Sequence, residues 1–254
     1  MSEIKLIKGD CLVEMQSIAD KSVDMVLCDL PYGTQKQNGL EWDIMIPFEQ
    51  LWQQYERIIK DNGAIVLFGV EPFSSLIRCS NLALYKYDWM WDKKNGANFA
   101  QAPYMPIKNV ENICVFSKAT IAQNSKNRMV YNPQGTERCY KVQRGRASNS
   151  FRPKRALQQD FIQELTNYPK QIIQFAKDKD TYHPTQKPVA LLEYLIKTYS
   201  NEGDTILDNT MGSGSTMVAC VNTKRNGIGI ELNDEYFAIA EKRVKEAQSQ
   251  LTLF

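Results

Sequence analysis

Short apolar runs alternate with segments of helical periodicity along much of the chain. The runs at residues 23–28 and 64–69 are continuous and short, as in buried strands, and residues 48–60 between them carry apolar side chains at helical spacing. This alternation predicts an α/β fold, in which a parallel sheet has helices on both faces. The expected strands are residues 23–28, 64–69, 88–91, 112–116, 205–208 and 227–231, and the expected helices are residues 48–60, 189–200, 215–223 and 234–248.

Composition limits the classes to which the protein can belong. With 254 residues, 43% of them hydrophobic, the chain is long enough for one large domain or for a domain with an insertion. Its N-terminus lacks the apolar run of a signal peptide, and no segment is apolar over the roughly 20 residues of a membrane span. We therefore expect a cytoplasmic protein without membrane association. The single His and six dispersed Cys, none in a C-x-x-C pair, predict reduced thiols and no metal site.

Positive charge is concentrated in the middle of the chain. The net charge of the whole chain is +2, but residues 118–180 hold 13 Lys and Arg against 5 Asp and Glu. Residues 144–155 contain no acid and interleave cations with Phe, Pro, Ser and Asn, which suits contacts with nucleic-acid phosphates. A solvated surface loop is the alternative interpretation. The candidate DNA-binding residues are Arg144, Arg146, Arg152, Lys154 and Arg155.

A glycine turn joins an expected strand to an expected helix near the C-terminus. The strand ends at Asp208, and Gly212 and Gly214 precede the helix. At the carboxyl end of a parallel strand such a turn lets a ligand approach the backbone, and Glu231, which ends the next strand, could accept both hydroxyls of a ribose. Nicotinamide cofactors and S-adenosylmethionine (SAM) both satisfy this pattern. SAM is favoured because the third glycine is missing and because Asp208 would repel a pyrophosphate, yet could accept a hydrogen bond from an ammonium group.

A second candidate site follows the first expected strand. Asp29, Leu30, Pro31 and Tyr32 emerge at its carboxyl end, although Pro31 and Gly33 are also ordinary strand-ending residues, so a purely structural turn is the alternative. The exocyclic amine of a nucleobase is a poor nucleophile because its lone pair is delocalised into the ring. The Asp29 carboxylate and the Leu30 carbonyl oxygen can accept its two N–H groups and direct the lone pair at an electrophilic methyl group, while Tyr32 stacks on the base.

These segments resemble the motifs of the DNA amino-methyltransferases. Residues 29–32, D-L-P-Y, resemble the catalytic D-P-P-Y motif, and residues 208–216 resemble the D-P-F-x-G-S-G-T-T loop that binds SAM. Residues 183–188, H-P-T-Q-K-P, are similar to the element at the methionine end of SAM, and residues 8–11, K-G-D-C, to the element that faces its adenine. The motif order is that of the β group of the family. The resemblance implies a Rossmann-like SAM-dependent methyltransferase sheet and a SAM site formed by Asp10, Cys11, Asp29, Thr185, Lys187, Asp208, Met211, Gly212, Ser213, Gly214, Ser215, Thr216 and Glu231.

Single positions discriminate between several related activities. Asp29 is associated in this family with adenine as the target, so the resemblance implies methylation of adenine N6, with cytosine N4 as the alternative. Leu30 and Asn209 stand where the family has proline, which leaves a non-catalytic DNA-binding protein with a SAM fold as a further alternative. Cytosine C5 methylation needs a Pro-Cys nucleophile, and it is disfavoured because no proline precedes Cys28. Residues 111–113, E-N-I, superficially resemble the E-N-V element of the C5 enzymes, but without that nucleophile they are interpreted as the start of a strand. The motif order disfavours methyltransferases that act on protein glutamine.

The combined interpretation is a site-specific DNA methyltransferase that acts on adenine. Residues 1–117 and 181–254 would form the catalytic domain, and residues 118–180 a target-recognition insertion. The expected substrate is double-stranded DNA, from which the target adenine must flip out to reach SAM. The resemblance further suggests a homodimer and a cognate restriction endonuclease as partners.

Overall fold

The computed structural model describes residues 2–33, 43–122, 125–143, 161–178, 182 and 185–251. The chain divides into two compact units, one formed by Met1–Asn132 with Gln171–Phe254 and the other by Pro133–Lys170. The elements of the larger unit are β1 (Ile4–Lys8), α1 (Cys11–Glu14), η1 (Met15–Ser17), β2 (Val23–Cys28), α2 (Phe48–Ile58), β3 (Ile59–Gly69), α3 (Phe73–Ser80), β4 (Tyr85–Ala97), η3 (Phe99–Gln101), β5 (Lys108–Phe116), β8 (Ile172–Gln174), α4 (Val189–Tyr199), β9 (Thr205–Asp208), α5 (Ser215–Asn222), β10 (Asn226–Glu231) and α6 (Asp234–Leu251).

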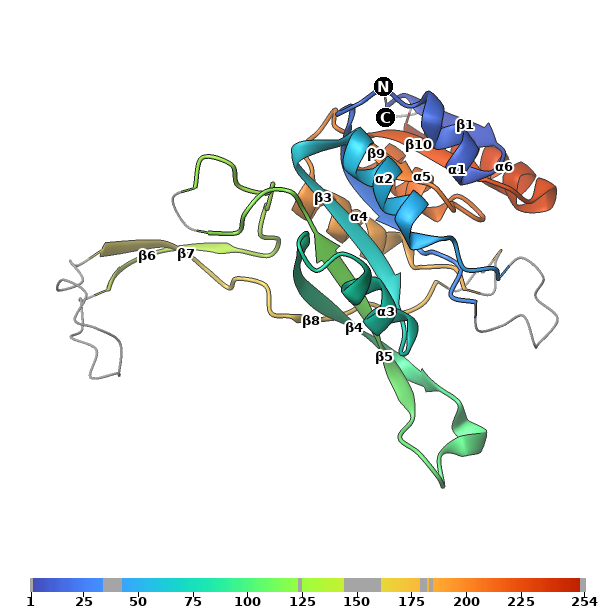
Figure 1. Cartoon of the computed structure of the whole chain (residues 1–254). Helices are drawn as coiled ribbons and strands as arrows, with labels where there is room; N and C mark the ends of the chain where they lie inside the picture. The colour runs from blue at the N-terminus through green and yellow to red at the C-terminus, as the bar shows by residue number, and fades with distance from the viewer. Residues whose placement is uncertain are drawn as a thin grey trace. The chain divides into compact units, whose positions relative to one another are not determined.

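Eight strands of the larger unit form one sheet in the order β1-β10-β9-β2-β3-β5-β4-β8 (Figure 1). The pairs from β1 to β3 are all parallel, as the alternation of strands and helices predicts. β5 runs antiparallel to both β3 and β4, so the expectation of a parallel sheet is wrong at this position. The physical reason is the connection between β4 and β5, which is a hairpin arm carrying the short turn η3 and not a crossover helix.

Helices cover both faces of this sheet, as predicted (Figure 1). Because successive side chains of a strand point to opposite faces, β2 supplies both cores. Met25 and Leu27 pack in the core that contains the apolar residues of α4, α5 and α6. Val26 and Cys28 pack in the core that contains those of α1, α2 and α3. The helices on both faces hold the strand ends in fixed positions, as a catalytic site at those ends requires.

The amphipathic pattern of α2 explains both its existence and its end. Leu51, Trp52, Tyr55 and Ile58 are buried and lie on one side of the helix. The prediction extends this helix to residue 60, but Ile59 already has extended backbone angles and begins β3. Strands β2 and β9 have the predicted bounds, and α4, α5 and α6 differ from the prediction by one to three residues at their C-terminal ends only.

The topological switch point of the sheet lies between the parallel neighbours β9 and β2. β9 continues into α5 on one face of the sheet, whereas β2 is followed by α2 on the other face. In open α/β sheets, ligands bind beyond the carboxyl ends of the strands at such a switch point. The two candidate motifs follow these two strands. In the part of the chain that the structure describes, no helix is long and apolar enough to cross a membrane.

The smaller unit contains an antiparallel pair of strands, β6 (Glu137–Gln143) and β7 (Phe161–Thr166). Its side chains Tyr140, Val142 and Ile162 are exposed. In sequence this unit falls inside the predicted insertion at residues 118–180, whose target-recognition role stays a prediction. The five candidate DNA-binding cations lie between β6 and β7 in sequence, outside the described residues.

Candidate active site at the β2 and β9 strand ends

The fold brings the D-L-P-Y turn and the glycine loop together. β2 and β9 are parallel neighbours, with Met25 opposite Ile206, so their carboxyl ends lie side by side. The Thr210 hydroxyl donates a 3.0 Å hydrogen bond to the backbone oxygen of Asp29. This bond fixes the start of one predicted motif against the other, although the two are far apart in sequence.

A buried polar contact lies beneath this junction. The Cys28 Sγ atom is 3.1 Å from the Asp208 carboxylate and 2.9 Å from the Asn209 side-chain oxygen. Burial raises the pKa of Asp208 to about 6, because a low-dielectric surrounding disfavours its charged form. Burial likewise raises the pKa of Cys28 well above its ordinary value, so this residue is a protonated donor and is unsuited to act as a nucleophile.

Asp29 lies in a network of charged side chains. Its Oδ2 atom accepts a hydrogen bond from Lys187 Nζ, and its Oδ1 atom accepts a 2.6 Å hydrogen bond from the Tyr32 hydroxyl. The same Lys187 ammonium is 3.0 Å from a carboxylate oxygen of Glu111. Burial raises the pKa of Asp29, and the Lys187 charge opposes this rise. Burial also disfavours the charge of Lys187, but the two adjacent carboxylates outweigh this effect and raise its pKa.

Glu111 and its partner Lys93 are residues of this network that sequence reasoning misses. The sequence places Glu111 at the start of a strand, and it does lie in β5, with its side chain only 4% exposed. Its second carboxylate oxygen is 2.6 Å from Lys93 Nζ on β4. The signal in the sequence is a single acid two residues before the apolar segment 113–116, because a carboxylate that enters a core must have cationic partners.

The other members of the D-L-P-Y turn are packed into the fold. The Leu30 side chain is 3% exposed within the core on the α2 side of the sheet, which is consistent with an apolar residue where the family has proline. The Tyr32 ring stacks on Phe73, with ring centres 4.7 Å apart. Pro31 is half-buried. The roles of these residues toward a base stay predictions.

The glycine loop is held by the backbone and by one arginine. Gly212 and Gly214 have φ angles of +52° and +79°, which favour glycine. The Gly214 N–H donates to the Met211 carbonyl oxygen at 2.9 Å. From α6, Arg243 donates to the Ser213 carbonyl oxygen at 2.6 Å and to the Ser215 hydroxyl at 3.0 Å. The loop therefore keeps its shape through contacts within the fold.

Glu231 provides a direct test of whether an adenosine cofactor fits. One of its carboxylate oxygens accepts the Gly212 N–H at 2.9 Å, and the other accepts the Asn233 N–H at 2.7 Å. Each carboxylate oxygen can accept two hydrogen bonds, so each retains one free acceptor position. The backbone thus orients a half-buried carboxylate that can still accept two neighbouring hydroxyl groups. This geometry fits a ribose.

The remaining predicted cofactor residues differ in how closely they join this site. The Gly9 N–H donates to the Glu231 carbonyl oxygen at 3.0 Å, which brings the K-G-D-C element to the end of β10. Asp10 uses its side chain to cap α1, accepting the Leu12 N–H at 2.8 Å. The Thr185 carbonyl oxygen is 3.4 Å from Lys187 Nζ. Cys11 is half-buried, whereas Thr216 is buried at the start of α5.

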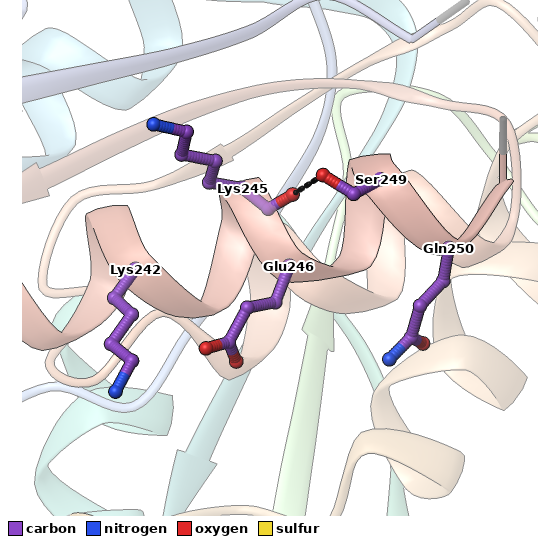
Figure 2. Close-up of a pocket in the computed structure, with 5 residues that line it drawn as sticks. All are labelled: Lys242, Lys245, Glu246, Ser249 and Gln250. Carbon is purple, nitrogen blue, oxygen red and sulfur yellow. Dashed lines mark hydrogen bonds between the residues drawn. The ribbon is translucent and has the colours of Figure 1, made fainter.

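The described residues give little support to other kinds of site. Within these ranges, no group of three His, Cys, Asp or Glu side chains is arranged to hold a metal ion. A shallow depression lies along α6, where the Ser249 hydroxyl donates to the Lys245 carbonyl oxygen at 2.8 Å (Figure 2). It is lined by residues of one helix and contains none of the predicted site residues. We therefore assign the candidate site to the strand ends.

Replacing Gly214 with Ala should lower the free energy of unfolding by about 1–3 kcal/mol. An added Cβ would lie 2.8 Å from Ala240 Cβ and 3.1 Å from Ala240 Cα, in a backbone conformation that already disfavours alanine. Urea unfolding measures the change. Gly203→Ala is the matched control, because Gly203 has a φ of +85° but no atom within 4 Å of an added Cβ. Equal losses in both variants would show that the close approach of the loop to α6 has no energetic consequence.

Comparisons with known proteins agree with this geometry. Residues 23–242 match the family described as DNA methylase, of the N6 and N4 type. The chain is 27% identical to the DNA adenine methyltransferase YhdJ of Escherichia coli (strain K12), over 95% of this chain and 83% of that protein. It is 26% identical to the Type II methyltransferase M.HpaI of Haemophilus parainfluenzae, over 94% of this chain and 74% of that protein.

A solved structure has a similar fold. The crystal structure of the M1.HpyAVI–SAM complex superposes with a TM-score of 0.63 and 25% identity, covering 95% of this chain and 98% of that chain. The similarity therefore extends over nearly the whole length of both proteins and is not confined to the glycine loop.

Proposed function

Since this chain belongs to the N6/N4 DNA methylase family, we propose that it transfers a methyl group from SAM to the exocyclic N6 amine of an adenine in double-stranded DNA. The observation that carries the proposal is the position of Asp29 at the end of β2, against the glycine loop that follows β9. The name of YhdJ, a DNA adenine methyltransferase, supports adenine as the target. Cytosine N4 is the second candidate, since the family includes N4 enzymes.

Asp29 and Leu30 would activate the amine by accepting its hydrogen bonds. The Asp29 oxygens each accept one bond within the protein, from Tyr32 and from Lys187, and each retains an acceptor position for an N–H group. With the second N–H directed to the Leu30 carbonyl oxygen, the nitrogen lone pair is freed from the ring. Catalysis would then rest on the orientation of the amine and on a preorganised carboxylate. No covalent enzyme intermediate would form.

The cofactor would be held by residues of both strand ends. Glu231 would accept the ribose hydroxyls, the loop from Met211 to Ser215 would lie against the methionine part, and Lys187 would contribute a cation near the methionine carboxylate. SAM, when bound, supplies an electrophilic methyl group on its sulfonium sulfur and leaves as S-adenosylhomocysteine. The methylated amine would then release one N–H proton to solvent through the Asp29 carboxylate that accepts it. Asp208, with a pKa of about 6, would be an acceptor for the ammonium group.

The target base must leave the helical stack to reach Asp29. Extrusion of a base costs a few kcal/mol, which contacts in the pocket would offset. The partly exposed Tyr32 would contact the flipped ring, and Phe73 behind it holds the tyrosine in place. DNA as the substrate also leads us to propose a cytoplasmic location. A homodimer and a cognate restriction endonuclease are further parts of the proposal, the latter supported by the Type II designation of M.HpaI.

The decisive experiment is long-read sequencing of genomic DNA from a host that lacks its own DNA methyltransferases and expresses this protein. We expect N6-methyladenine at one recurring sequence, and a much smaller modified fraction at that sequence when the Asp29→Asn variant is expressed at the same level. N4-methylcytosine at a recurring sequence would support the second candidate. Unmodified DNA, with SAM binding intact by calorimetry, would favour a non-catalytic DNA-binding protein.

The basic segment should supply phosphate contacts that position the enzyme on DNA. Replacing Arg144, Arg146, Arg152, Lys154 and Arg155 with Gln should weaken DNA binding. The slope of log K against log salt should become shallower by about 0.9 for each phosphate that the variant no longer neutralises. Fluorescence anisotropy at several salt concentrations measures both changes. Lys242→Gln/Lys245→Gln is the control, because these exposed cations on α6 lie outside the candidate site. An unchanged slope in the first variant would return residues 144–155 to the solvated-loop interpretation.

A further inference from the structure

Glu111 is a buried acid that the proposed chemistry does not use. Its carboxylate lies between two cations, with one oxygen 2.6 Å from Lys93 Nζ and the other 3.0 Å from Lys187 Nζ. The exposed fractions of these side chains are 4% for Glu111, 8% for Lys187 and 19% for Lys93. A carboxylate this deeply buried is stable only with such partners. Its position in β5 would be filled by an apolar residue if packing were the sole requirement.

The Glu111 group joins Asp29 through two shared contacts. Lys187 donates to both carboxylates, and the Tyr32 hydroxyl, which donates to Asp29 at 2.6 Å, is also 3.3 Å from a Glu111 oxygen. Two carboxylates therefore face two ammonium groups, and the four charges balance. The charged and titratable groups that face Asp29 are Lys187 from the segment before α4, Glu111 from β5, Tyr32 from its own turn and Asp208 from β9.

We propose that Glu111 is a positioning residue for methyl transfer, which shares the Lys187 ammonium with Asp29 and, together with Lys93, sets the charge that the Asp29 carboxylate experiences. The proposal deepens the methyltransferase function and rests on it. Because the Lys187 ammonium is shared between two carboxylates, it holds the Asp29 side chain in position but neutralises only part of its charge. Asp29 then remains a strong acceptor for the N–H group of the base.

Removing one charge at a time should move the Asp29 titration in opposite directions. Without the Glu111 charge, the Lys187 ammonium acts on Asp29 alone, and the pKa of Asp29 should fall. Without the Lys93 charge, the Glu111 charge is less compensated, and the pKa of Asp29 should rise. Glu111 raises the pKa of Asp29, and charges within about 4–6 Å shift a pKa by about one unit or more, so removal of the Glu111 charge is measurable. Lys93 contacts the Glu111 oxygen that does not face Lys187, so its removal should give a smaller shift of opposite sign. If Glu111 and Lys93 only filled space, their replacement would not shift the pKa of Asp29 in opposite directions.

The test is a charge cycle of Glu111→Gln, Lys93→Gln and the double variant. The Asp29 carboxyl carbon is followed by 13C NMR in the free protein, with Asp29→Asn for assignment. We expect the midpoint to fall by about one pH unit in Glu111→Gln, to rise by a smaller amount in Lys93→Gln, and to lie between the two single-variant values in the double variant. The kcat for DNA methylation should fall about tenfold in Glu111→Gln, because a more fully neutralised Asp29 is a weaker acceptor, and should fall less in the double variant.

Controls separate this inference from the proposed function. Asp61→Asn removes the same charge from an exposed ion pair with Lys21 and should leave the midpoint unchanged. Equal midpoints across the cycle, or shifts of the same sign in both single variants, would overturn the role of Glu111. If the wild-type protein methylates no DNA, the proposed function fails, but the NMR titration of the free protein still decides the coupling. If Glu111→Gln does not fold, the upward shift in Lys93→Gln remains the test.

Discussion

Asp29→Asn should lower kcat for DNA methylation by about 10²–10³-fold, the range seen when one preorganised polar group is removed from a reacting centre. The amide keeps the size of the carboxylate and its contact with Tyr32. Its NH2 group can only donate hydrogen bonds and its oxygen carries no full negative charge, so it is a poorer acceptor for the amine N–H. The lone pair of the base nitrogen then stays delocalised. Single-turnover transfer of a labelled methyl group to DNA measures the loss.

SAM binding provides the internal control for this variant. The Glu231 carboxylate is held by the Gly212 and Asn233 backbone, independently of the Asp29 side chain, so the ribose site should persist. We expect the Kd for SAM to change by less than about tenfold, which corresponds to about 1.4 kcal/mol, because the substitution leaves the residues that would hold the ribose in place. Full methyl transfer by a variant with normal SAM affinity would remove Asp29 from the catalytic assignment.

Lys187→Met should lower the free energy of unfolding by about 3–5 kcal/mol at pH 7, because it leaves the buried Glu111 and the half-buried Asp29 without their shared cation. In the wild-type protein the neighbouring lysines overcome the effect of burial and hold the pKa of Glu111 below its ordinary value. Its ionised form therefore stabilises the fold above the pKa of the unfolded chain. This stability is lost as the pH falls through the folded-state pKa.

In the Lys187→Met variant both pKa values should rise, because Asp29 loses its ammonium partner and Glu111 keeps only Lys93. The ionised carboxylates therefore destabilise the variant, relative to the wild type, progressively as the pH rises. Urea unfolding at pH 4 and pH 7 should give a wild-type advantage that is smaller at pH 4. Lys60→Met is the matched control, since its partly exposed pair with Asp24 should contribute less than about 1 kcal/mol. An advantage independent of pH would show that Lys187 stabilises by packing alone.

The strands that carry the site could be predicted because their patterns are local. β2 and β9 are short apolar runs, each with an aspartate at or just after its end, and the structure gives them the predicted bounds. The strand β1 is absent from the prediction, because its sequence I-K-L-I-K mixes apolar residues with lysines at an edge of the sheet. The direction of β5 could not be predicted either, since hydrophobicity carries no information on direction and only the hairpin connection determines it.

The charge network could not be predicted for a different reason. Glu111, Lys93 and Lys187 are distant in sequence, and only the pairing of β4 with β5 and the return of the chain before α4 place them together. The glycine loop and Glu231, in contrast, belong to one strand, turn and strand unit, so their relation is visible in the spacing. Contacts within one supersecondary unit are therefore predictable here, and contacts that cross the sheet are not.

Through the pairing of β2 with β9, the proposed reaction centre is built from residues on both sides of the basic segment. Asp29 and Glu111 come before the basic segment, and Lys187, Asp208 and Glu231 come after it. If the backbone were broken within residues 144–160, each fragment would carry part of one sheet and neither would carry a complete site. Two separately encoded fragments would regain activity only on reassembly, so this connection offers a natural place to build a conditional enzyme.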